Sequence, residues 1–401
     1  MDKRNEMKKY LSRLNLYLLL AVLALATSCQ EKKRPILFPN GRNESIRYAQ
    51  QLKIVDYDGY TIATIANPWK EGEVLHRYVL IPKGREGDKL LDTLNVPKGK
   101  EACDIVRTPV ERAVVFTSPH CQLMYDIGCA HAIVGVCDLE YMNIPDIHKR
   151  VKEKDIANCG SSMQPSIEQV IASKPEVMLI SLFENNGGYG KLAKLGVPII
   201  ETADYMETSP MGRAEWMKFY GRLFATDADK EVTCEKNAKI LYANVEKDYV
   251  LLCSKANDLP LGLSILTERK MGGVWYVPGG NSTMGILLKD AHAKYVFADD
   301  THSGSLALSP EQVLAKADSI DVWAFKYLGD KPLSKQDLLQ EFGGYSVLKA
   351  FRSGNIYECN TSSLPYFEKT SFHPEVLLRE FILLSHPEVK DLGKLQFYTH
   401  L

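Results

Sequence analysis

SIEQVIASKPEVMLI (166–180) and SPEQVLAKADSIDVW (309–323) open with the same pattern, Ser-x-Glu-Gln-Val-(Ile/Leu)-Ala, and each runs on into an apolar, strand-like stretch. A serine followed by glutamate and glutamine ahead of an apolar run predicts the start of an α-helix. The preceding text also matches: LMYDIGCAHAIVGV (123–136) and GILLKDAHAKYVFA (285–298) each predict a helix end, an Ala-His-Ala tripeptide and a short strand. Two copies of one α/β unit predict two similar lobes, because a solenoid needs several short periods.

Composition gives the broad class of the chain. Its 401 residues are 45% hydrophobic and 25% charged, with a formal net charge of −1. This length allows two domains with substantial cores, and these proportions are those of ordinary globular proteins. The net charge, and the lack of a basic run interleaved with aromatic residues in the body of the chain, give no reason to expect a nucleic-acid partner.

The N-terminus resembles a secretory signal. Five basic residues within positions 1–13 precede the apolar run LNLYLLLAVLALATSC (14–29), which is too short for a comfortable membrane span. Ala-Thr-Ser-Cys at 26–29 resembles a bacterial lipobox, in which Cys29 is lipidated and becomes the first mature residue. The alternative is a plain signal peptide with an incidental Cys29. We expect a signal peptide at 1–28 and a lipid-anchored tether at 29–48, which places the protein in the periplasm on a membrane that it does not span.

Eight further cysteines follow Cys29. Some could pair in an oxidising compartment. No Cys-x-x-Cys occurs, and several cysteines lie in predicted apolar helices or strands, where a free thiol behaves as a small hydrophobic group. We expect mainly buried free thiols, with one or two disulfides in the first lobe as the alternative.

The rest of the chain divides into four predicted segments. Alternating strands and turns, with a hairpin signal at Asp58-Gly59, predict a β-rich leader packed on the first lobe. Strands that alternate with helices predict mostly parallel sheets in both lobes. The predicted segments are the leader at 49–110, the N-terminal α/β lobe at 111–208, connecting helices at 209–257 and the C-terminal α/β lobe at 258–401.

The longest predicted helix lies between the lobes, at about 227–256. Its apolar positions recur at helical spacing from Ala238 to Leu252. Roughly thirty residues at about 1.5 Å each span about 45 Å, which predicts a strut rather than flexible hinge strands. The expected fold is therefore α/β, with two Rossmann-like lobes of mostly parallel sheet joined by one long rigid α-helix, plus the β-rich leader.

This layout resembles the class III substrate-binding proteins of bacterial ABC importers, the group that captures ferric siderophores, haem and cobalamin. The resemblance covers about residues 112–389 and is carried by the order of the motifs over two lobes. The matching motifs are DIGCAHAIVGV (126–136), Gly160, Ser-Ile-Glu (166–168), Lys-Pro-Glu (174–176), SPMGRAEWMKFYG (209–221) and His-Pro-Glu at 373–375 and 386–388. The resemblance implies cargo bound between the lobes and no catalysis.

The resemblance also implies a role for the repeated helix start. In the family, a glutamate on the outer tip of each lobe meets arginines of the two permease subunits, and Glu168 and Glu311 match those positions. A binder with pseudo-two-fold symmetry that docks on a two-fold transporter has to present the same anion twice. A carboxylate also stabilises a helix N-terminus, so a purely helical role is the alternative, and both roles can hold together.

Candidate cargo contacts come from loops at the carboxyl ends of strands, where open α/β sheets bind ligands. Aromatic faces suit a flat macrocycle or aromatic chelate, and cations suit its carboxylates or phosphate. The candidates are Ser118, His120, Tyr141, Met142, Phe183 and Glu184 in the first lobe, and Arg269, Trp275, Tyr276, Lys326, Tyr327 and Tyr366 in the second. The same loops also offer Thr117, Glu140, Tyr189, Lys270 and Phe367.

Each candidate also has an ordinary structural explanation. His120 follows a proline at a helix start, where a structural or solvent-facing histidine is more common than a metal ligand. Trp275 and Tyr276 could pack their own loop, and Tyr366 could be a core aromatic. Arg269 could be an ordinary surface charge.

Other functions are less well supported by the sequence. A bare-metal binder needs clustered histidines and carboxylates, and the nine histidines form no His-x-His or His-Glu-x-x-His. An extracytoplasmic hydrolase lacks a Gly-x-Ser-x-Gly elbow, and Ser118 with His120 has no indicated acid partner. A surface lipoprotein that scavenges a cofactor for another receptor is a third class. We expect a monomer without resident cofactor, whose cargo is a ferric siderophore, haem or cobalamin.

Overall fold

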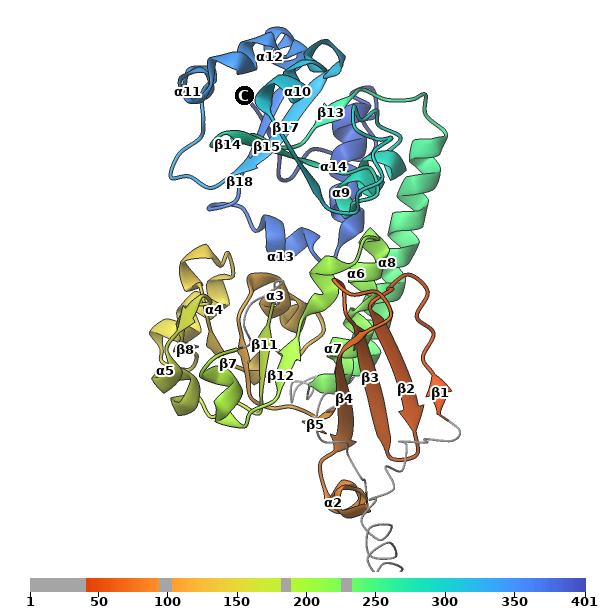
Figure 1. Cartoon of the computed structure of the whole chain (residues 1–401), viewed down its shortest axis with the longest axis vertical. Coiled ribbons are helices and arrows are strands. Elements are labelled where there is room, and N and C mark those ends of the chain that lie inside the picture. Colours follow the sequence, from red (N-terminus) through yellow and green to blue (C-terminus); the bar gives the residue numbers. More distant parts are fainter. Residues whose placement is uncertain (1–40, 94–102, 182–188, 225–232) are drawn as a thin grey trace, which may run out of the picture. The chain divides into compact units, whose positions relative to one another are not determined.

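The computed structural model describes residues 41–93, 103–181, 189–224 and 233–401 (Figure 1). The predicted signal peptide, Cys29, Phe183 and Glu184 lie outside the described residues. Within the described ranges we find no helix with the length and hydropathy of a membrane span.

The leader forms a five-stranded sheet in the order β1-β2-β3-β4-β5. Its elements are β1 (Arg42–Asn43), β2 (Leu52–Tyr57), β3 (Tyr60–Ala66), β4 (Val74–Pro82), α2 (Arg85–Thr93) and β5 (Cys103–Thr108). The hairpin predicted at Asp58-Gly59 is confirmed: Tyr57 pairs with Tyr60 across a two-residue turn in which Gly59 has φ = 83°. Glycine adopts this backbone conformation without the steric cost that a Cβ brings.

The N-terminal lobe is built on a parallel sheet in the order β12-β11-β6-β7-β8. Its strands are β6 (Ala113–Val115), β7 (Ile133–Val136), β8 (Ala157–Asn158), β11 (Val177–Ile180) and β12 (Ile199–Glu201). β6, β7, β11 and β12 are buried at every position, as expected for parallel strands covered on both faces. The chain adds β7 and β8 on one side of β6 and then crosses to add β11 and β12 on the other, so the strand order reverses beside β6.

Short helices connect the strands of this lobe. They are α3 (Ser118–Asp126), η1 (Ala130–Ala132), η2 (Leu139–Tyr141), α4 (Pro145–Lys152), α5 (Ile167–Ala172) and η3 (Leu192–Leu195). The pair β9 (Gly160–Ser161) and β10 (Gln164–Pro165) forms a small separate ribbon.

Three helices follow the N-terminal lobe: α6 (Pro210–Glu215), α7 (Met217–Leu223) and α8 (Cys234–Asn257). Helix α8 has 24 residues and is capped at its N-terminus by Thr233, whose side chain accepts from the Lys236 N–H. The helix is therefore shorter than the predicted one, and residues 225–232 lie outside the described ranges. It packs on α7 at one end and on α9 (Thr283–Asp290) and α14 (Pro374–Ser385) of the C-terminal lobe (Figure 1).

The C-terminal lobe contains two sheets. The first has the order β13-β17-β18-β19, with β13 (Ile265–Leu266), β17 (Val322–Tyr327) and β18 (Ile356–Asn360) parallel and β19 (Thr399–His400) antiparallel. The second is antiparallel, with β14 (Lys270–Met271), β15 (Val274–Pro278) and β16 (Ser305–Leu308). The loop expected to carry Arg269 and Trp275 is therefore in part a hairpin, because β14 and β15 pair there.

The repeated helix start is confirmed in both lobes. Ser166 caps α5 and Ser309 caps α10 (Pro310–Leu314), and each hydroxyl accepts the backbone N–H of the glutamine three residues on. The strand predicted after the second Ala-His-Ala is wrong. Lys294 forms one isolated bridge with Ser264, and the N–H groups of Ala298 and Asp300 bond within the segment instead of to a neighbouring strand.

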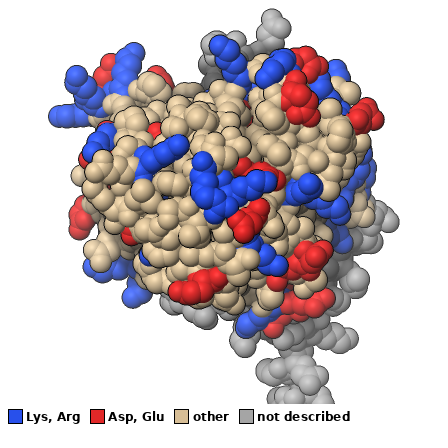
Figure 2. Space-filling view, turned by 90° about the horizontal axis from the view of Figure 1, so that it is seen from above, with Lys and Arg blue, Asp and Glu red and all other residues tan. Residues whose placement is uncertain are grey.

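One hydrophobic core joins the segments of the chain. It contains Tyr78 of the leader, Val115 of the N-terminal lobe, Trp216 between α6 and α7, Tyr249 of α8 and Phe381 of α14. All eight cysteines of the described residues are free thiols, and only Cys253 among them is not fully buried. On the face shown in Figure 2, basic and acidic side chains are interspersed, and neither sign gathers into one continuous patch.

Candidate functional site

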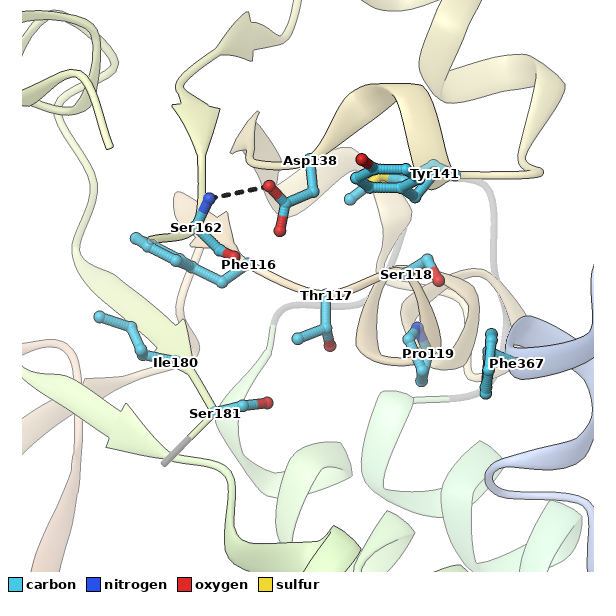
Figure 3. A pocket seen from close by; sticks show the side chains of 11 residues that line it. Phe116, Thr117, Ser118, Pro119, Asp138, Tyr141, Ser162, Ile180, Ser181 and Phe367 are labelled. Atoms are coloured by element: carbon cyan, nitrogen blue, oxygen red, sulfur yellow. Dashed lines mark hydrogen bonds between the residues drawn. The ribbon is translucent and has the colours of Figure 1, made fainter. Parts of the chain in front are cut away.

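A cavity of about 350 Å³ lies at the carboxyl ends of β6, β7 and β11 (Figure 3). This place is beside the reversal of strand order, where open α/β sheets bind their ligands. The lining residues are Phe116, Thr117, Ser118 and Pro119 after β6, Asp138, Tyr141 and Met142 after β7, Ser162, Ile180, Ser181, and Phe367 of α13 (Tyr366–Thr370). Phe367 is the contribution of the C-terminal lobe, so both lobes reach the cavity.

Aromatic faces and hydroxyls dominate the wall of the cavity. Tyr141 and Phe367 are 56% and 47% exposed, so both rings are accessible to a ligand in the cavity. The serines and Thr117 add hydroxyls. The lining residues in the described ranges include the carboxylate of Asp138 but no lysine or arginine. The wall therefore suits a ligand with a flat apolar face and polar edges.

Asp138 is held by the backbone around it. It adopts a left-handed conformation with φ = 52°, which short polar side chains tolerate better than most. Its N–H donates to the Gly160 carbonyl at 2.8 Å, and its Oδ1 accepts the Ser162 N–H at 2.9 Å. Figure 3 shows the second carboxylate oxygen directed toward the interior of the cavity.

A buried hydrogen-bond network lies behind Thr117. The Thr117 Oγ1 is 2.5 Å from Nδ1 of His120, and Nε2 of His120 is 2.8 Å from Oδ1 of Asp204. The Tyr220 hydroxyl donates to the same Asp204 oxygen at 2.7 Å, and Arg213 Nε donates to Oδ2 at 3.1 Å. His120 is 3% exposed and Asp204 is fully buried, so the network ends at the cavity through Thr117.

The partners of Asp204 explain why it stays ionised. Burial alone raises the pKa of a carboxyl group, but the contacts with His120 and with Arg213 outweigh it. The pKa of Asp204 is therefore held well below its ordinary value. Burial and the Asp204 charge both raise the pKa of the Tyr220 hydroxyl well above its ordinary value, which keeps it a donor.

The structure brings three of the predicted contacts together at the cavity: Ser118, Tyr141 and Met142. His120 does not line the cavity, because both ring nitrogens are bonded inside the protein. The C-terminal candidates lie elsewhere. Trp275 is fully buried, with its Nε1 donating to the Glu268 carbonyl at 3.0 Å.

The other C-terminal candidates have intramolecular partners. Lys326 pairs with Glu268 at 2.7 Å, and Arg269 pairs with Glu341 while it lies over the rings of Phe325 and Tyr327. Tyr327 donates its hydroxyl to the Lys331 carbonyl at 3.1 Å, and Tyr366 packs edge-on against Phe367 and Phe397 in the core. Tyr276 is 45% exposed but is not among the lining residues. The predicted cationic contacts thus do not face the cavity.

Sequence reasoning missed part of the wall. Asp138, Ser162 and Ser181 were not candidates, although Asp138 lies two residues after β7 and Ser181 directly follows β11. Asp204 was missed as well, since it lies 84 positions from His120 and only folding brings the two together. Thr117 and Phe367 came from loops that the sequence did single out.

Glu168 and Glu311 are both exposed in the first turns of α5 and α10. Ser166 donates its hydroxyl to Glu168 Oε2 at 3.3 Å. Hydrogen bonds from its own backbone N–H and from Ser309 lower the pKa of Glu311. Both side chains thus act at helix N-termini and remain accessible from solvent.

Residues 114–362 match the model of the periplasmic binding protein family. Two relatives from Methanocaldococcus jannaschii, each named an uncharacterized lipoprotein, are 22% and 24% identical over 368 and 357 residues. The matches cover 88% and 86% of this chain, and 84% and 83% of the relatives.

Solved structures show the same fold. A periplasmic haem-binding protein from Pseudomonas aeruginosa aligns with a TM-score of 0.51 and 17% identity, over 70% of this chain and 94% of its own. A protein of an ABC-type Fe³⁺-hydroxamate transport system from Saccharomonospora viridis aligns with a TM-score of 0.50 and 21% identity, over 69% of this chain and 92% of its own. An ABC transporter substrate-binding protein from Listeria monocytogenes aligns with a TM-score of 0.51 and 16% identity, over 69% of this chain and 99% of its own. The predicted family resemblance and the two-lobed α/β fold are confirmed, and the chain belongs to the periplasmic binding protein family.

Proposed function

We propose that this protein is a lipid-anchored binding protein that captures a metal chelate or corrinoid outside the cytoplasm and delivers it to an ABC permease. The cargo is a ferric siderophore, haem or cobalamin. The observation that carries the proposal is the cavity beside the reversal of strand order, into which Tyr141 of one lobe and Phe367 of the other project. The lipoprotein relatives and the haem- and hydroxamate-related structures support this assignment.

The two exposed rings supply the main binding surface in this proposal. An aromatic contact contributes about 0.5–1.5 kcal/mol beyond the area it buries, so two rings favour a flat conjugated ligand. The hydroxyls of Ser118, Ser162 and Ser181 would bond to polar groups at the edge of that ligand. Contacts from both lobes also make binding favour one relative position of the lobes.

A second candidate is an acyl hydrolase, and one observation favours it. His120 has an acid partner, Asp204, and a hydroxyl partner, Thr117, in an order that resembles a nucleophile, base and acid. Release of nitrophenol from a nitrophenyl ester that is lost on Thr117→Val would support this reading. We favour the binding protein because the family match covers both lobes.

The test of the proposal is calorimetric titration of the purified mature protein with haemin, cyanocobalamin, a ferric trihydroxamate and a ferric tricatecholate. We expect at least one to bind with micromolar affinity or better, on the order of −8 kcal/mol. Tyr141→Ala and Phe367→Ala should each weaken that binding by about fivefold to tenfold.

Tyr276→Ala is the matched control, since Tyr276 is exposed to a similar degree but does not line the cavity. Its affinity should equal that of the unaltered protein. Failure of all four ligands to bind, or an equal loss of affinity in the Tyr276 variant, would overturn the proposal.

A further inference from the structure

The position of the Thr117 hydroxyl hydrogen follows from the network behind it. Nε2 of His120 faces the ionised Asp204 at 2.8 Å, so this nitrogen carries a proton and donates it. Arg213 already balances the Asp204 charge at 3.1 Å, and a buried network without net charge is favoured. The hydrogen-bond pattern therefore assigns a neutral imidazole whose Nδ1 is an acceptor.

An acceptor at Nδ1 takes the hydrogen of the Thr117 hydroxyl, which lies 2.5 Å away. The hydroxyl oxygen then has lone pairs but no hydrogen left for a ligand. Thr117 is partly exposed, and Figure 3 shows its side chain between those of Ser118 and Ser181 around the cavity.

We propose that His120, locked by Asp204, is a positioning residue that fixes the Thr117 hydroxyl as a hydrogen-bond acceptor, so that the cavity selects cargo that presents hydrogen-bond donors. This inference rests on the proposed function, and it names the chemistry of the cargo edge. It differs from an ordinary threonine contact, because a free hydroxyl would rotate to donate or accept as the ligand requires.

Asp138 strengthens the same selection. Its second carboxylate oxygen is directed into the cavity, and it also can only accept. The lining residues in the described part of the chain provide no lysine or arginine to receive a cargo carboxylate. Amide, amine or hydroxyl groups on the cargo edge therefore fit this wall, and carboxylates are repelled by it.

The test uses matched pairs of probes in which an amide or amine is replaced by a carboxylate. The pairs are cyanocobalamin and its monocarboxylate, the bis-amide of haemin and haemin, and a ferric trihydroxamate with a free amine and its succinylated form. The unaltered protein should prefer the donor-bearing member of the pair that it binds by about tenfold or more.

Asp204→Asn inverts the network without removing it. The amide oxygen has to accept from Arg213, which turns the amide N–H₂ toward His120 and Tyr220. Nε2 of His120 then becomes the acceptor, Nδ1–H donates to Thr117, and the Thr117 hydrogen turns to the cargo. The preference for the donor-bearing probe should fall by about tenfold, a change that loss of packing alone would not produce.

Thr117→Val removes the hydroxyl and keeps the shape of the side chain. It should weaken the donor-bearing probe by about threefold to tenfold, and in its presence Asp204→Asn should change the preference by less than about twofold. Thr117→Ser should retain the preference of the unaltered protein. Asp146→Asn is the matched control, because Asp146 accepts the Tyr125 hydroxyl at 2.6 Å outside the cavity.

The outcomes separate the two proposals. If no probe binds the unaltered protein, the proposed function and this inference both fail. If a probe binds but Thr117→Val and Asp204→Asn leave the preference unchanged, the function stands and the inference is overturned. If Asp204→Asn does not fold, as judged by circular dichroism, an unchanged preference in Thr117→Val still overturns the inference, and a reduced preference that Thr117→Ser restores supports it.

Discussion

The backbone N–H of Asn143 donates to the carboxylate of Glu368 at 3.0 Å, across the two lobes. The side-chain amide of Asn143 also donates to the carbonyls of Thr361 and Leu364, each at 3.1 Å. Asn143 directly follows the N-terminal wall of the cavity, and Glu368 directly follows Phe367. One asparagine therefore ties together the two chain segments that face the cargo.

Asn143→Ala should lower the free energy of unfolding by about 1–2 kcal/mol, because the Thr361 carbonyl loses its donor and the Leu364 carbonyl keeps only the Tyr366 N–H. Urea denaturation followed by tryptophan fluorescence measures this. Asn281→Ala is the control, since Asn281 makes one exposed hydrogen bond to the Thr301 carbonyl at 3.2 Å and its loss should cost less than about 0.5 kcal/mol. Equal losses in the two variants would contradict a special role for Asn143.

Glu215 fastens the leader to the helices between the lobes. Its buried carboxylate accepts the backbone N–H groups of Arg47, Tyr48 and Ala49 at 2.7–3.0 Å, and Lys218 Nζ at 2.7 Å. Glu215→Gln should lower the free energy of unfolding by about 2–4 kcal/mol, because an amide nitrogen would meet some of these donors and Lys218 would lose its counter-charge. Limited proteolysis should then cleave near residues 41–51 sooner than in the unaltered protein.

The control for this variant is Glu246→Gln, which removes a pairing with Arg47 at the surface. Surface ion pairs are screened by water and contribute little, so this variant should change stability little. A similar rate of cleavage in both variants would show that the leader is held by other contacts.

His76 should make stability depend on pH. Its ring nitrogens lie 3.4 Å from the carboxylates of Asp104 and Glu201, and although burial opposes it, these partners raise the pKa of His76 to about 9. The ordinary value in an unfolded chain is about 6.5, so the contribution is fully present below about pH 6.5 and is lost as pH rises through about 9. The free energy of unfolding should fall by about 1–3 kcal/mol over this range.

His76→Gln should flatten this decline, measured by urea denaturation at pH 6.5 and 9.5. His373, whose pKa is also raised to about 9 by Asp126 and Glu375 against the effect of burial, retains its own share in that variant. His302→Gln should leave the decline unchanged, because His302 is 71% exposed. An unaltered slope in His76→Gln would rule out the contribution of His76.

The double charge reversal Glu168→Lys with Glu311→Lys should abolish cargo uptake by cells and leave cargo affinity within about twofold. The reason is that both carboxylates are exposed at equivalent helix starts, one in each lobe, and neither lines the cavity. Uptake of radiolabelled cargo and calorimetry measure the two effects. Glu153→Lys with Glu388→Lys makes the same change of charge at other exposed positions and should retain uptake. Undiminished uptake in the first variant would favour a surface scavenger that needs no permease.

Local chemistry explains which parts of the fold could be predicted. The helix caps at Ser166 and Ser309 depend only on residues nearby in the sequence. Strands β6 and β7 are apolar because both faces of their sheet are covered. The stretch after His292 has the same apolar character, but a strand needs a partner, and Lys294 finds only a single bridge. A local sequence pattern does not determine which distant segments pair as strands.

The candidate site could likewise be predicted only in part. The loops of the cavity followed from the order of strands and helices, which is why Ser118 and Tyr141 were predicted and found there. The direction of each side chain did not follow. Trp275 points into the core, where its indole N–H donates to the Glu268 carbonyl. His120 points inward because its Nε2 is hydrogen-bonded to the buried Asp204.

The hydrophobic core that joins the leader, the linking helices and both lobes limits how far this protein can be truncated. Family membership is defined by residues 114–362, yet Tyr78 before that range and Phe381 beyond it belong to the same apolar cluster as Val115 and Trp216. A fragment limited to residues 114–362 would expose the apolar side chains that Tyr78 and Phe381 cover. Such a fragment would aggregate and could not be used to measure cargo binding. Expression should therefore begin near Gly41 and continue through Leu401.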